Sequence, residues 1–220
     1  MESLNDSTGH EAAWIKSSPQ VFWGEIAPYE HVVQIYENDN AFLDLLADFI
    51  VEGVNTKECV IVIATKIHQE ELDKRLILAG YEPSTLVSSG QLISIDAEEA
   101  LTKFMVNDWP DENLFNQLIT ELITRAKGNG PGIRAFGEMV AILWAKGQVG
   151  ATVRLEHLWN KFCTNEAFCL FCAYPQSGFT QDASESIMHI CSAHSRMINN
   201  ASDGKGSKEL FYKSMKRKAM

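Results

Sequence analysis

Apolar residues in the central part of the chain alternate between short continuous runs and stripes at helical spacing. The short runs are rich in β-branched and aromatic residues, as in strands buried on both faces; they are Val32–Tyr36, Cys59–Ala64, Leu92–Ile95, Ile133–Phe136 and Phe168–Ala173. The stripes predict helices over Ala41–Glu52, His68–Ala79, Leu114–Ala126, Met139–Lys146, Val149–Asn165 and Ser184–Ile198. This alternation predicts an α/β fold: a three-layer α-β-α, doubly wound, mainly parallel sheet of five or more strands.

The pattern weakens at both ends of the chain. Residues 1–28 carry helix breakers and form a predicted N-terminal arm, although Trp14, Phe22 and Trp23 indicate that part of it packs on the domain. Residues 29–200 form the predicted main domain. Residues 201–220 begin with small and polar residues and end with basic ones, which predicts a linker followed by a flexible basic tail or short helix.

Composition excludes some classes of partner. The chain has 220 residues and a formal net charge of −10, which argues against general affinity for nucleic acid or an acidic membrane surface. Neither a signal peptide nor a run of roughly 20 apolar residues is visible. The five cysteines all lie in apolar contexts, so we expect buried, reduced thiols in a cytoplasmic protein.

The turn after the first predicted strand lacks the features of a phosphate-binding loop. It reads Tyr36-Glu37-Asn38-Asp39-Asn40, with two carboxylates and with no glycine or lysine. A phosphate site needs free backbone N–H groups and a cation. The sequence therefore predicts a nucleotide-binding frame without phosphate chemistry: no enzyme activity and no cofactor.

Polar residues follow the carboxyl ends of the predicted strands, where open parallel sheets bind ligands. We expect a crevice there for a small organic ligand, formed by Tyr36, Glu37, Thr65, His68, Asp96, Glu138 and Tyr174. We expect His31, before the first strand, either to contact the ligand or to pack against neighbouring residues. Trp144 either lines an apolar pocket for the ligand or belongs to the hydrophobic core. The simpler interpretation is that these polar residues are helix caps and solvated loop ends.

Glu138 is the best single candidate, because a carboxylate that leaves a buried strand needs a partner. It could instead cap the helix Met139–Lys146, or pair with Arg134 on the same strand.

No metal site is predicted. Cys169 and Cys172 are three residues apart in a strand and so face opposite sides. Cys191 and His194 share a face of the last predicted helix and could reach Cys172 or Tyr174, but further ligands are missing. Glu156 and His157 are adjacent on a helix and point apart, which makes a poor acid–base pair.

Several separated motifs resemble one known family, the MEDS domain, a sensory domain named for methanogens and methylotrophs and for the dichloromethane-responsive regulator DcmR. The motifs are Gln34–Glu37 with His31 before it, Gly137–Trp144, Leu155–Asn160, Phe171–Pro175 and Ile190–His194. The resemblance covers roughly residues 29–198. It implies a bacterial or archaeal cytoplasmic domain that senses small hydrocarbon derivatives, in a family often attached to histidine kinases or DNA-binding segments.

A more distant resemblance links Gly53, Glu58–Val62, Leu76–Tyr81 and Gly90–Leu92 to RecA/KaiC-type ATPases, which implies a RecA-like fold. Three hypotheses follow. The first is a non-catalytic sensory domain that binds a small organic effector and signals to a partner such as a histidine kinase or transcription regulator. The second is a degenerate nucleotide-binding domain with Glu37, Asp96 and Glu138 facing Mg²⁺. The third is a pure protein-interaction adaptor. Under any of these hypotheses the protein could form a homodimer.

Overall fold

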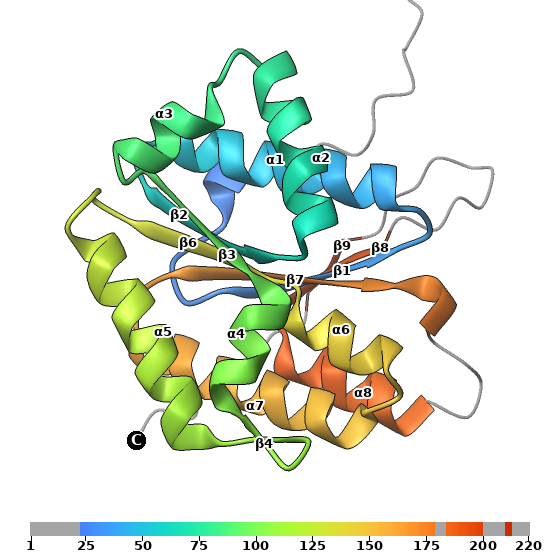
Figure 1. The fold of residues 1–220 in the computed structure, drawn as a ribbon. Coiled ribbons are helices and arrows are strands. Elements are labelled where there is room, and N and C mark those ends of the chain that lie inside the picture. Colours follow the sequence, from blue (N-terminus) through green and yellow to red (C-terminus); the bar gives the residue numbers. More distant parts are fainter. Residues whose placement is uncertain (1–22, 179–183, 200–209, 213–220) are drawn as a thin grey trace, which may run out of the picture.

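A seven-stranded sheet organises the chain (Figure 1). The computed structural model describes residues 23–178, 184–199 and 210–212. The strand order is β3-β2-β6-β7-β1-β8-β9, and all pairings are parallel except that of β9 with β8. The strands are β1 His31–Tyr36, β2 Cys59–Ala64, β3 Leu92–Asp96, β6 Ile133–Gly137, β7 Cys169–Pro175, β8 Arg196–Asn199 and β9 Leu210–Tyr212.

Helices cover both faces of this sheet, which gives the predicted three layers (Figure 1). One face packs against α1 Asp39–Asn55, α2 Lys66–Leu78, α3 Pro83–Ser88 and the short 3-10 helix η1 Trp23–Glu25. The other face packs against α4 Ala97–Phe104, α5 Glu112–Lys127, α6 Met139–Ala145, α7 Val149–Asn165 and α8 Ser184–Ala193. A small antiparallel hairpin, β4 Met105–Val106 with β5 Trp109–Pro110, and the 3-10 helix η2 Gln176–Gly178 complete the described elements.

Alternation along each strand separates two hydrophobic cores. Every residue of β2 is buried; Cys59, Ile61 and Ile63 face α4–α8, and the residues between them face α1–α3. Such complete burial is expected of a parallel strand with helices on both sides. The five predicted strands are confirmed, with boundaries that differ by at most two residues.

The last predicted helix is wrong over its final third. The sequence predicted one helix over Ser184–Ile198, whereas α8 ends at Ala193 and residues 196–199 form β8 beside β1. Ser195 explains the break: its N–H donates to the His31 carbonyl at 2.7 Å, and its hydroxyl accepts from the His31 N–H at 3.0 Å. These bonds hold the chain in register with β1 and divert it from the helix.

The ends of the described region add two findings. Trp23, from the predicted arm, is buried between the rings of Phe49 and Phe171, with centroids 4.7 and 5.1 Å away. Trp14 and Phe22 lie outside the described residues. Three residues of the predicted tail, Leu210–Tyr212, form β9 at the edge of the sheet.

Candidate functional site

The turn between β1 and α1 consists of Glu37 and Asn38, because β1 ends at Tyr36 and α1 begins at Asp39. Asn38 is extended, with φ −146° and ψ 150°, and its side-chain oxygen accepts the Ala41 N–H at 2.9 Å. One of the N–H groups that a phosphate would need is thus satisfied by the chain itself.

Glu138 joins the carboxyl ends of β2 and β6. Its Oε2 accepts the backbone N–H of Thr65 at 2.8 Å, and its Oε1 lies 2.7 Å from Nδ1 of His68. The Thr65 hydroxyl lies 3.4 Å from Oε1. Thr65 also caps α2, so the carboxylate is tied to the first turn of that helix.

Glu138 occupies the N-cap position of α6, at the positive end of that helix, but its side chain makes no capping hydrogen bond to it. The pairing of Glu138 with Arg134 is wrong. Arg134 is directed away from it, because its guanidinium pairs with Glu58, donates to the Phe49 carbonyl at 3.2 Å and lies over the Phe49 ring. Arg134 lies at the start of β6, next to the start of β2, whereas Glu138 follows the other end of β6.

Aromatic rings connect this group to β1. The Tyr36 ring stacks on Phe42 with centroids 4.8 Å apart, and Phe42 meets His68 edge-on at 5.3 Å. Burial raises the pKa of Tyr36, and the charges of Asp39 and Glu138 add to the rise. The hydrogen bond that His68 donates to Glu138 raises the pKa of His68, against the opposing effect of burial. We call Tyr36, Thr65, His68 and Glu138 the carboxyl-edge cluster.

Three other predicted site residues have separate positions. Asp96 accepts the N–H groups of Glu98 and Glu99 and thus caps α4, as the simpler interpretation held. Its second oxygen lies 3.8 Å from Nζ of Lys66. Glu37 is exposed in the turn after β1. Trp144 is buried; its indole N–H donates to the Gly178 carbonyl at 2.8 Å, and its ring meets Tyr174 edge-on.

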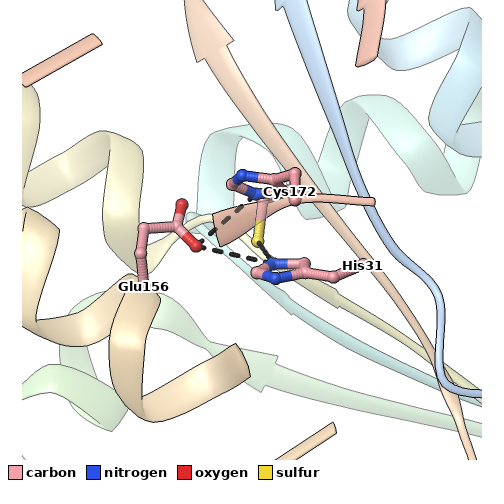
Figure 2. A group of neighbouring side chains, drawn as sticks. His31, Glu156 and Cys172 are labelled. Carbon is pink, nitrogen blue, oxygen red and sulfur yellow. Dashed lines mark hydrogen bonds and ion pairs between the residues drawn. The ribbon is translucent and has the colours of Figure 1, made fainter. Parts of the chain in front are cut away.

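His31 and Tyr174 belong to a second group, on the face of the sheet that packs against α7 and α8. His31 begins β1, and its Nε2 lies 3.3 Å from Sγ of Cys172 and 3.5 Å from Oε2 of Glu156 (Figure 2). His194, between α8 and β8, places its Nε2 3.5 Å from the same carboxylate oxygen. One ligand atom from each of these four residues lies within 4.8 Å of the others. We call His31, Glu156, Cys172 and His194 the buried quartet.

Neighbouring groups fix the orientation of the quartet. The Tyr174 hydroxyl donates to Oε1 of Glu156. Nδ1 of His194 lies 2.6 Å from the Ile190 carbonyl, which requires the hydrogen on Nδ1 and leaves a lone pair on Nε2. Oε2 of Glu156 and Nε2 of His194 make no hydrogen bond to any part of the chain that the structure describes.

Burial favours the uncharged form of every member of the quartet. It raises the pKa of Glu156 to about 8, although the Tyr174 hydrogen bond opposes the rise, and it lowers the pKa of His194 to about 4. It also lowers the pKa of His31 and raises that of the Cys172 thiol. Desolvation without a compensating charge is the common cause.

The quartet as a group was not predicted from the sequence. The prediction that Cys169 and Cys172 face opposite sides is confirmed, since Cys169 packs on the α1 side and Cys172 on the α7 side. Glu156 was considered only with its neighbour His157, as a poor acid–base pair. The available signal was different: Glu156 lies on the apolar stripe of α7, between Leu155 and Trp159, and is 1% exposed. A carboxylate in such a stripe predicts a buried polar partner.

The remaining expectations concern cysteines and membranes. Cys59, Cys163, Cys169 and Cys172 are buried, as predicted, but Cys191 is only partly buried and lies 3.9 Å from the Met197 sulfur. Across the described segments, no helix combines the length and apolar character needed to cross a bilayer.

Three solved structures with similar folds are archaeal proteins. A protein from a structural study of Pyrococcus horikoshii OT3 aligns with a TM-score of 0.56 and 9% identity, over 89% of this chain and 92% of its own. A KaiC-like protein from the same organism has a TM-score of 0.56 and 8% identity, over 86% and 81% of the two chains. The flagellar accessory protein FlaH from Methanocaldococcus jannaschii has a TM-score of 0.50 and 10% identity, over 79% and 72%.

These similarities confirm the RecA-like fold and give no information about activity. No curated protein matches the sequence. Residues 30–195 match the family described as MEthanogen/methylotroph, DcmR Sensory domain. The chain therefore belongs to the MEDS family of sensory domains.

Proposed function

We propose that this protein is a non-catalytic sensory domain that binds a small organic effector at the carboxyl-edge cluster and passes the signal to a partner protein. Membership of a sensory family supports a sensory role. The observation that carries the choice of site is the Glu138–His68 contact of 2.7 Å at the carboxyl ends of β2 and β6, beside the buried Tyr36 phenol. This is the edge at which open α/β sheets bind ligands.

The hydrogen bonding of His68 indicates which kind of effector fits the site. Because Glu138 accepts the hydrogen on Nδ1, Nε2 of His68 is an acceptor in the neutral ring and a donor in the protonated ring. The rings of Tyr36 and Phe42 supply an apolar surface beside it. A small, mostly apolar molecule with one polar group, such as a short alcohol, aldehyde or halogenated hydrocarbon, fits both features.

Tyr36 connects binding of the effector to the signal that a partner protein reads. It directly precedes the two-residue turn that starts α1, so an effector that contacts its ring shifts the equilibrium position of that turn and of the helix behind it. We propose a histidine kinase or transcription regulator as the partner that reads this shift.

Calorimetry of the full chain against a panel of such compounds tests the site. We expect a compound that binds the wild type to lose at least tenfold in affinity in Glu138→Gln and Tyr36→Phe, with no change in Glu121→Gln, which alters an exposed carboxylate on α5. Unchanged affinity in both site variants contradicts the proposal.

Three measurements test the other hypotheses. Titration with Mg²⁺ and ATP or GTP tests residual nucleotide binding, in which Asp96 and Glu138 would have to release their present hydrogen bonds. Co-purification of the tagged full chain from its host tests the partner. Size-exclusion chromatography of the chain with and without residues 1–28 tests self-association.

A further inference from the structure

Four side chains with metal-binding atoms converge beneath the sheet from four different elements. His31 comes from β1, Glu156 from α7 and Cys172 from β7 (Figure 2). His194 comes from the segment between α8 and β8. All four are at most 2% exposed. Clusters of acidic groups are common on surfaces, but a fully buried set of two imidazoles, a carboxylate and a thiol requires a physical explanation.

We propose that His31, Glu156, Cys172 and His194 bind one divalent transition-metal ion of the zinc(II) or iron(II) class. This site lies on the other side of the sheet from the carboxyl-edge cluster. The metal site and the effector site can therefore be tested independently of each other.

The distances fit a tetrahedral ion. Metal–ligand bonds of about 2.0–2.3 Å imply ligand–ligand separations of about 3.3–3.8 Å in a tetrahedron. Three measured edges of the quartet are 3.3 Å (His31 to Cys172), 3.5 Å (His31 to Glu156) and 3.5 Å (His194 to Glu156). The other pairs of ligand atoms lie within 4.8 Å, so small side-chain rotations complete the set.

The lone pairs are directed for coordination. The Ile190 carbonyl holds the hydrogen of His194 on Nδ1, so that Nε2 presents a lone pair to Oε2 of Glu156, 3.5 Å away, and the two atoms make no hydrogen bond. Once Glu156 has lost its proton, both atoms are acceptors, and a cation between them stabilises that arrangement. The Tyr174 hydroxyl, by donating to Oε1, leaves Oε2 as the coordinating oxygen.

The donor set selects the class of ion. Imidazole and thiolate suit zinc, iron and cobalt, whereas magnesium and calcium require oxygen ligands. Coordination releases the protons of Glu156 and Cys172, and the two resulting negative charges balance those of a divalent ion. The filled site is then electrically neutral in an environment without water.

Cobalt(II) is the probe for the test, because a thiolate ligand gives it a charge-transfer absorption and tetrahedral geometry gives it intense visible bands. The reduced full-length protein, stripped with a chelator, is titrated with cobalt and then with zinc. We expect one ion per chain, a thiolate–cobalt band, and displacement of cobalt by zinc. Elemental analysis of the purified protein identifies the ion present.

Matched variants locate the site. Cys172→Ser should abolish the thiolate–cobalt band, whereas Cys169→Ser, on the same strand but facing the other core, should keep it. Glu156→Gln keeps the hydrogen-bond acceptor for Tyr174 and should weaken cobalt binding by more than tenfold. His157→Gln, which alters the exposed neighbour of Glu156, should not. Tyr174→Phe removes the orienting hydroxyl and should weaken binding by roughly 10- to 100-fold.

The proposal is overturned if the reduced protein takes up neither ion, or if uptake persists without change in Cys172→Ser and Glu156→Gln. If Cys172→Ser does not fold by circular dichroism, Glu156→Gln and Tyr174→Phe decide the question alone. Undiminished binding in those two also overturns it.

Discussion

Nδ1 of His68 lies 2.7 Å from the carboxylate of Glu138, although the two residues are 70 positions apart in the sequence. The contact joins the start of α2 to the end of β6 across the carboxyl edge of the sheet. Both side chains are largely buried, so the pair contributes to stability as well as to the proposed site.

The His68–Glu138 contact predicts a pH dependence of stability. Because the pKa of His68 is raised on folding, its contribution is fully present below the unfolded value of about 6.5 and is lost as the pH rises through the folded pKa. We expect the free energy of unfolding by urea to fall over that window in the wild type. Glu138→Gln should flatten this part of the profile, and an unchanged profile would contradict the assignment.

Removal of the Glu138 carboxylate should be costly. Glu138→Ala leaves the Thr65 N–H and the His68 ring without their partner, and we expect a loss of about 2–3 kcal/mol in the free energy of unfolding. Glu121→Ala, on an exposed face of α5, should change it by less than about 0.5 kcal/mol. Equal effects of the two variants would show that Glu138 is not engaged.

Arg134 and Glu58 should behave as a coupled pair. Arg134 is 4% exposed, so Arg134→Ala removes the partner of a half-buried carboxylate and also the contact with Phe49. We expect a loss of about 3 kcal/mol. A double-mutant cycle with Glu58→Ala should give a coupling energy above about 1 kcal/mol. Simple additivity of the two single variants would refute a direct pairing.

Trp23 should anchor the segment before β1. Its side chain is 3% exposed against Phe49 and Phe171, so Trp23→Ala should reduce the free energy of unfolding by about 3–5 kcal/mol. Trp109→Ala, at an exposed hairpin position, is the matched control and should cost less than about 1 kcal/mol. Chemical denaturation of the full chain measures both, and a similar loss in the two variants would argue against the anchor.

The proposed ion should stabilise the native state by mass action. At a free zinc concentration about 100 times the dissociation constant, the free energy of unfolding should rise by about 2.7 kcal/mol, and a chelator should reverse the rise. Cys172→Ser should lose this effect and Cys169→Ser should retain it. A zinc effect of equal size in both variants would place the ion elsewhere.

Much of the fold follows from local patterns in the sequence. The five predicted strands were recognisable because burial on both faces makes them largely apolar, and Cys59–Ala64 is apolar throughout. The strand β8 was not recognisable from the sequence, because its extended path depends on the Ser195–His31 hydrogen bonds. These bonds join residues 164 positions apart. Local periodicity carries no information about such pairing.

The candidate site residues were likewise predictable only in part. Convergence of Thr65, His68 and Glu138 follows from the rule that parallel strands end at one edge, whereas Asp96 obeys the same rule and yet serves α4. His31 and Tyr174 were chosen individually but belong with Glu156, which projects from a helix on the other face. Contacts between layers depend on packing, which strand and helix patterns alone do not specify.

The brevity of the β1–α1 connection limits how the chain can be re-engineered. Phosphate-binding loops of the GxxxxGK[ST] type span eight positions, whereas here two residues separate the strand from the helix. Glycine or lysine substitutions at Glu37 and Asn38 cannot supply that length. A designer who wished to convert this scaffold into a nucleotide hydrolase would have to insert backbone between Tyr36 and Asp39.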